Sequence, residues 1–127
     1  MATMDVQLVA PDRMIWSGEA EMVIARTVVG DIGILPRHIP LLGVLAEAPV
    51  RIKREGEDDL VAAVHGGFLS VGRDGVQVLA EVVELADEID TGRARQALDR
   101  AKGGDDEESA AAARRATARL RAAGETV

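Results

Sequence analysis

The sequence has no cysteine and no tyrosine, and its aromatic side chains are one tryptophan and one phenylalanine. The lack of cysteine excludes disulfide frameworks, cysteine metal sites and thiol nucleophiles, and two histidines are too few for us to expect a transition-metal site. No segment approaches the ~20 apolar residues of a membrane helix, and no basic segment followed by an apolar run opens the chain. We therefore expect a chain that is neither exported nor inserted into lipid.

Positive charge is also scarce over most of the chain. Residues 1–89 hold 7 basic and 15 acidic side chains, a balance of −8, whereas residues 90–127 hold 8 and 7, a balance of +1. Nucleic acids and anionic lipids are bound by basic surfaces, so this acidic main body argues against both as partners.

Catalytic motifs are missing as well. The sequence contains no phosphate-binding glycine loop with its lysine, no HExxH, no serine elbow and no histidine beside a nucleophile. We therefore expect no catalytic residue, no metal site and no required cofactor. His38 and His65 are interpreted as shape-setting or interface residues, and Trp16 and Phe68 as core residues.

What the sequence does contain is a series of short β patterns. Apolar residues make up 47% of the 127 residues, enough for a packed core. Residues 3–10 alternate between apolar and polar side chains, residues 13–17 and 20–29 are expected to pair with them as a meander, and GRDG at 72–75 predicts a hairpin turn. Eight to ten such strands, with no alternating helices, indicate a β-sandwich or a flattened barrel.

Residues 30–42, GDIGILPRHIPLL, are the least regular part of this region. Two glycines and two prolines predict a shaped loop, because glycine reaches backbone angles that other residues avoid and proline fixes its own φ. The isoleucines and leucines of this loop are expected to pack into the core or to meet a partner, and its polar tips are expected to stay exposed.

The composition changes near residues 87–90, where helical patterns begin. Asp90 is a suitable N-cap for a first helix that ends at Gly103-Gly104, and a second helix opens in the acidic residues 105–108. A short connection predicts an antiparallel hairpin. Because its apolar stripes are mostly alanine, we expect it to dock loosely.

Asp90 and Arg93 have three open interpretations. At i and i+3 of a helix start, they could cap the helix, pair with each other, or bind a polar ligand with help from Arg100 or the arginines of the second helix. The arginines of the second helix form either a solvated face or a surface that complements an acidic partner.

Three segments in order resemble the epsilon subunit of bacterial F-type ATP synthases, the counterpart of the mitochondrial delta subunit. They are the stretch at 30–42, VHGGFLSV at 64–71 with the following strands, and IDTGRA at 89–94. The resemblance implies a ten-stranded β-sandwich at 1–87 and a C-terminal antiparallel two-helix hairpin at 88–127. The family pattern more often has a small residue where Arg37 stands.

The resemblance also implies a function. The chain would be a non-catalytic central-stalk subunit that couples proton flow to ATP synthesis, peripheral on the cytoplasmic face of the bacterial plasma membrane. Its sandwich would bind the gamma subunit and the ring of c subunits, and its helices would reach the alpha/beta catalytic head and inhibit ATP hydrolysis.

Two sets of site residues follow from the resemblance. Asp31, Arg37 and His38 would contact the c-ring, and Asp90, Arg93 and Ala94 would bind regulatory ATP. The alternative function is a stand-alone β-sandwich module that senses a nucleotide through Asp90 and Arg93.

Overall fold

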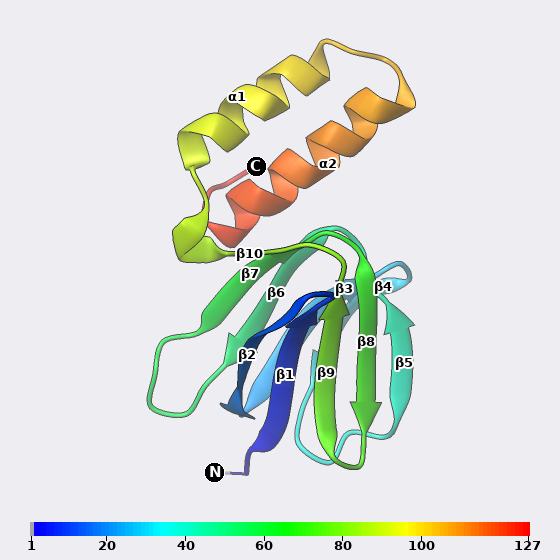
Figure 1. Cartoon of the computed structure of the whole chain (residues 1–127), viewed down its shortest axis with the longest axis vertical. Helices are drawn as coiled ribbons and strands as arrows, with labels where there is room; N and C mark the ends of the chain where they lie inside the picture. The colour runs from blue at the N-terminus through cyan, green and yellow to red at the C-terminus, as the bar shows by residue number, and fades with distance from the viewer. Residues whose placement is uncertain (1) are drawn as a thin grey trace.

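The computed structural model describes residues 2–127 and contains two five-stranded sheets followed by two helices (Figure 1). The sheet orders are β2-β1-β9-β8-β5 and β10-β7-β6-β3-β4. The predicted sandwich and hairpin are confirmed. The strands are β1 (Met4–Ala10), β2 (Arg13–Ala20), β3 (Met22–Thr27), β4 (Gly30–Ile34), β5 (Leu41–Val44), β6 (Ala48–Lys53), β7 (Leu60–Val64), β8 (Gly67–Gly72), β9 (Gly75–Ala80) and β10 (Val83–Leu85); a 3-10 turn η1 (Ala86–Glu88) leads to the helices α1 (Thr91–Lys102) and α2 (Glu107–Ala122).

The core lies between the two sheets and follows from the alternation along each strand. Val6 and Leu8 of β1 are fully buried, as are Val23 of β3 and Val78 of β9. Successive side chains on a strand point to opposite faces, so each strand contributes one apolar face to the core and leaves the other outside. Burial of these faces is the main source of stability for the sandwich.

The predicted meander of the first three strands is only half correct. β1 pairs with β2 in antiparallel register, but β3 belongs to the other sheet. The chain changes sheet at Glu21, whose N–H donates to the carbonyl of Lys53 on β6 at 2.8 Å. β1 instead pairs on its other side with β9, in parallel register, while Gly72 and Gly75 face each other across the predicted β8–β9 turn.

The stretch at 30–42 is not a single loop. Its first five residues form β4, β5 begins at Leu41, and only residues 35–40 lack regular structure. Ile34 is fully buried, but Leu35, Ile39 and Leu42 are 55%, 74% and 71% exposed. Packing into the core, the first of the two expected outcomes, therefore fails for these three residues. Leu35 lies past the end of β4, and Leu42 points away from the core because it alternates with Leu41.

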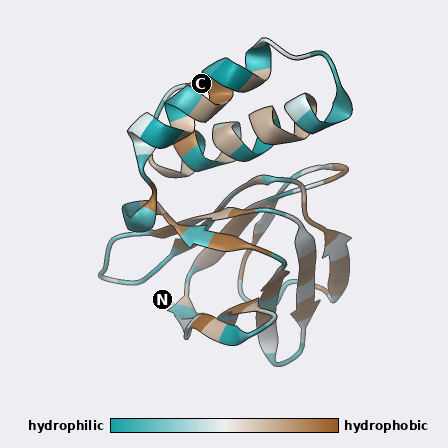
Figure 2. Cartoon of the chain, turned by 45° about the horizontal axis from the view of Figure 1, so that its top comes forward, coloured by the Kyte–Doolittle hydropathy of each residue, from teal (hydrophilic) through white to brown (hydrophobic). Residues whose placement is uncertain are grey.

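The two helices form an antiparallel hairpin at the end of the sandwich opposite the N-terminus (Figure 1). Ala94, Leu98, Ala116 and Leu120 pack together between them, and α2 is the helix that lies on β6 and β7. Figure 2 shows hydrophobic colour concentrated in the strands, whereas hydrophilic segments recur along both helices. Gly124, with φ of 87°, follows the end of α2 as predicted.

Candidate functional site

Asp90 begins α1 by capping it. Its backbone is extended, and its Oδ1 accepts a hydrogen bond from the backbone N–H of Arg93 at 3.0 Å. This contact satisfies one of the free donors at a helix start. Of the interpretations left open by the sequence, capping is confirmed, and it occupies one oxygen of the carboxylate.

A cleft of about 400 Å³ opens beside this cap, between α1, α2 and β10. Three arginines line it, Arg93, Arg100 and Arg119. Three acidic residues line it as well, Glu84, Glu88 and Asp90. Ala94 lines its wall while its side chain is buried among the hairpin residues. The predicted ligand residues Asp90, Arg93 and Ala94 therefore share one cleft, in which basic and acidic residues are equal in number.

Glu84 ties this cleft to the sandwich. Its Oε1 accepts from Nε of Arg119 at 2.7 Å and lies 2.9 Å from Nε2 of His65. Burial acts to raise the pKa of Glu84, but hydrogen bonds and charge from Arg119 and then His65 outweigh burial and hold that pKa below its usual value. Glu84 is therefore an ionised anchor between β10 and α2.

Sequence reasoning missed the role of His65. The residue was expected to set shape or meet a partner, yet both of its ring nitrogens lie 2.9 Å from carboxylate oxygens, of Glu47 and Glu84. These partners are 18 and 19 residues away in the chain. No local motif joins them, so only the pairing of the strands brings the cluster together.

Asp31 lies at the start of β4 and already has a partner. Nε of Arg26, its register neighbour on β3, donates to its Oδ1 at 2.7 Å. This hydrogen bond and the adjacent positive charge hold the pKa of Asp31 below its usual value. Arg121 of α2 lines the same small hollow of about 220 Å³, so Asp31 lies at the hairpin end of the sandwich.

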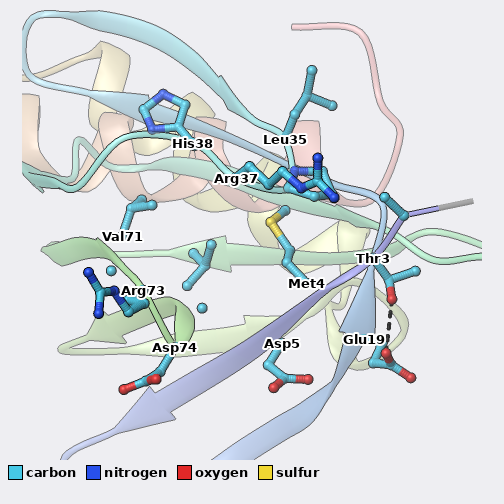
Figure 3. Close-up of a pocket in the computed structure, with 15 residues that line it drawn as sticks. Thr3, Met4, Asp5, Glu19, Leu35, Arg37, His38, Val71, Arg73 and Asp74 are labelled. Atoms are coloured by element: carbon cyan, nitrogen blue, oxygen red, sulfur yellow. Dashed lines mark hydrogen bonds between the residues drawn. The ribbon is translucent and has the colours of Figure 1, made fainter.

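Arg37 and His38 lie beyond the other end of β4, in the turn that leads toward β5. The N–H of His38 donates to the carbonyl of Leu35 at 3.1 Å, and Arg37 has a φ of 70°, a region that favours glycine. Figure 3 shows both residues at the rim of a cleft of about 580 Å³, across from Arg73 and Asp74 of the β8–β9 turn. The three predicted ring-contact residues are therefore divided between opposite ends of β4.

The outer face of the β2-β1-β9-β8-β5 sheet carries an apolar row. Val44, Phe68 and Leu79 are register neighbours on β5, β8 and β9, and their exposed fractions are 47%, 48% and 38%. Leu42 lies on the same face of β5 as Val44. The expectation of Phe68 in the core is wrong, because Leu69 takes the inward position, whereas Trp16 does pack against the core as expected.

Within residues 2–127, no cluster of three or more histidine, aspartate or glutamate side chains is arranged to hold a metal ion. Over the same residues, no helix has both the length and the apolar character needed to cross a membrane. The features with evident chemistry are the arginine-lined cleft, the two loop ends and the uncovered apolar row.

A two-sheet β-sandwich followed by a docked antiparallel helical hairpin defines the class of fold. The family model described as "ATP synthase, Delta/Epsilon chain, beta-sandwich domain" matches residues 3–86. The chain belongs to this family, and it is an epsilon-type subunit of ATP synthase.

Named relatives cover nearly the whole chain. The ATP synthase epsilon chain of Streptomyces avermitilis is 54% identical over 122 residues, which are 95% of each chain. That of Mycobacterium avium is 54% identical over 125 residues, 98% of each chain. The match therefore includes the hairpin as well as the sandwich.

Solved structures share the fold. A chain in the Euglena gracilis mitochondrial ATP synthase structure titled "OSCP/F1/c-ring in rotational state 1" matches with a TM-score of 0.86 and 24% identity, over 98% of this chain and 83% of that one. A chain of the Tetrahymena thermophila mitochondrial ATP synthase, titled "central stalk/cring", matches with a TM-score of 0.63 and 22% identity, over 97% and 96%.

Proposed function

We propose that the chain couples rotation to catalysis as the rotor subunit that joins the gamma subunit to the c-ring. The observation that carries this proposal is the uncovered row of Val44, Phe68 and Leu79, which no other part of the described chain covers. Apolar rows of this kind are rarely left in water unless they meet a partner. The gamma subunit is the proposed occupant, and the complex is peripheral on the cytoplasmic face of the bacterial plasma membrane, with no lipid insertion by this chain.

Phe68→Ser tests the gamma contact. Loss of a buried phenylalanine side chain costs roughly 1.5–3 kcal/mol, so binding to purified gamma subunit should weaken at least about tenfold in calorimetry. Val29→Ser is the matched control, because Val29 is 94% exposed but lies in the β3–β4 turn, away from the row. Equal affinities of the native chain and the Phe68 variant would remove this surface from the proposal.

The c-ring contact is proposed at the loop end that carries Arg37 and His38. Their side chains face a cleft at the end of the sandwich opposite the hairpin, where a second large partner can approach without meeting α1 or α2. Asp31 lies at the other end of β4 and is already paired with Arg26. Its proposed part in the same contact therefore requires the ring to reach around the edge strand β4.

The hairpin is the proposed regulator. It rests on the sandwich mainly through α2, and the buried α2 residues outside the interhelical cluster are alanines, Ala118 and Ala122. A small apolar interface of this kind favours an element that exchanges between two positions. Released from the sandwich, the helices would reach the alpha/beta catalytic head and inhibit ATP hydrolysis.

The cleft beside Asp90 is the proposed site for regulatory ATP. Arg93, Arg100 and Arg119 would bind the phosphates, and buried Ala94 keeps α1 close to α2 so that these groups converge. Asp90 caps α1 with one oxygen, which leaves the other for a ligand.

Calorimetry with ATP separates the cap from the ligand role. Asp90→Asn retains an N-cap but loses the charge, whereas Asp90→Ala loses both. A ligand role predicts that both variants bind ATP more weakly, and Arg93→Gln should lose about tenfold or more. Arg95→Gln is the control, because Arg95 pairs with Glu125 outside the cleft.

The same titration addresses the alternative function. A stand-alone nucleotide-sensing module would bind ATP tightly and show no affinity for gamma. Absence of ATP binding by the native chain would remove both that alternative and the proposed regulatory ligand, while leaving the rotor contacts untouched.

A further inference from the structure

His65 is a buried polar residue at the junction between the sandwich and the hairpin. The residue is 8% exposed and follows β7, where its backbone N–H donates to the carbonyl of Val82 at 2.9 Å. Glu47, just before β6, and Glu84, on β10, lie on the two sides of its ring. The imidazole is thus held between two carboxylates that come from different parts of the sheet.

Both ring nitrogens of His65 have a carboxyl partner. Nδ1 lies 2.9 Å from Oε2 of Glu47, and Nε2 lies 2.9 Å from Oε1 of Glu84. Because an imidazole can contact polar groups through both nitrogens at once, this one ring connects two side chains from different parts of the sheet.

The hairpin supplies positive charge to the same two carboxylates. Nε of Arg119 donates to Oε1 of Glu84, the oxygen that also faces Nε2 of His65. Nε of Arg114 lies 3.9 Å from Oε1 of Glu47, whose other oxygen faces Nδ1 of His65. Both α2 arginines thus approach carboxylates that also contact His65, and Arg114 in addition pairs with Glu107 on its own helix at 3.2 Å.

Apolar contacts give this interface little directional preference. Ala118 and Ala122 are the buried α2 residues outside the interhelical cluster, and Ala63 of β7 is fully buried outside the sandwich core. Methyl groups bury little area each and tolerate sliding. Hydrogen bonds to a charged group, in contrast, are strong and angle-dependent.

We propose that His65 is a positioning residue for the docked hairpin. Its ring holds the side chains of Glu84 and Glu47 in the positions where Arg119 and Arg114 of α2 contact them. The two glutamates contact His65 directly, and the two arginines contact those glutamates from α2. The inference concerns how the hairpin docks on the sandwich in the isolated chain. Only the effect of that docking on ATP hydrolysis rests on the proposed function. Unchanged hydrolysis after removal of the hairpin would contradict the proposed regulation without bearing on His65.

Nitrogen NMR of the histidine rings in the full chain tests the shared carboxylate directly. Arg119→Gln should shift the Nε2 signal of His65 more than its Nδ1 signal, because Arg119 and Nε2 share one oxygen of Glu84. Arg121→Gln is the matched control, since Arg121 lies two residues further along α2 and lines a different hollow. Unchanged ring signals in Arg119→Gln, or equal shifts in both variants, would overturn the proposal.

Hydrogen exchange of the α2 amides tests the coupling. His65→Gln and Arg119→Gln should each speed exchange roughly fivefold, the effect of losing one hydrogen bond to a charged group after solvent screening. The double variant should exchange no faster than His65→Gln alone, since the two residues act through Glu84. The proposal would be overturned if the double variant exchanged faster by the product of the two single effects, or if His65→Gln left the exchange rate unchanged. If His65→Gln does not fold, the NMR comparison decides, because both of its variants retain His65.

Discussion

Arg37 shows how a single backbone angle departs from local sequence preference. Its φ of 70° lies in the left-handed region, where a Cβ atom costs about 1–2 kcal/mol. The resemblance of the stretch to its family favours a small residue at this position, and the observed angle supplies the physical reason. Gly33, also in this stretch, has no such angle; a Cβ there would instead meet Cε of Met22 at 2.6 Å.

Arg37→Gly should therefore raise the free energy of unfolding by about 1 kcal/mol in urea titration, after the entropy that glycine adds to the unfolded chain. Arg37→Ala keeps the strained angle and should change stability little. Arg37→Gly also tests the proposed c-ring contact. If the complex that contains this more stable chain pumps protons more slowly with ATP, the chain has lost an interaction rather than its fold. Stability equal to that of the native chain would contradict the strain argument.

At the scale of elements, the helices were the easiest part to predict and their docking the hardest. Both N-caps, Asp90 and Asp106, accept from the backbone three residues on, as their local spacing suggests. The face that α2 presents to β6 and β7 depends on Glu47, His65 and Glu84, which are distant in sequence. Short-range periodicity carries no information on such contacts.

Glu84 gives the hairpin a dependence on pH. Because its pKa is lowered in the folded chain, its contribution is complete above the ordinary glutamate range near ~4 and is lost as pH falls through the lowered value. Protection of α2 amides should thus decline in acid by an amount worth about 1 kcal/mol or less, since Glu84 is partly exposed. The protection of α2 amides, plotted against pH, should differ between the native chain and Glu84→Gln at neutral pH and converge at low pH. Curves that stay parallel down to low pH would exclude Glu84 as the anchor.

At the scale of the whole molecule, the chain separates contacts from regulation. The apolar row and the Arg37 loop lie on the sandwich, whereas the arginine cleft requires the hairpin to be docked. Deletion of residues 90–127 should therefore leave assembly with gamma and the c-ring intact and raise ATP hydrolysis by the complex. The measurement compares the rate of ATP hydrolysis by complex reassembled with the truncated chain and with the full chain. Equal rates would rule out inhibition by the helices.

The sequence by itself determined most of the elements: alternating apolar residues predict eight to ten strands, and capped alanine-rich segments predict two helices, because these patterns act over a few neighbouring residues. The exception is β4, which lies in the stretch expected to be a loop. Tertiary structure decided which residues meet. Strand pairing turned Phe68 outward, separated Asp31 from Arg37 along β4, and enclosed His65 between two glutamates. Sheet order and register are set by contacts between distant segments, and those contacts define every candidate site except the Asp90 cap.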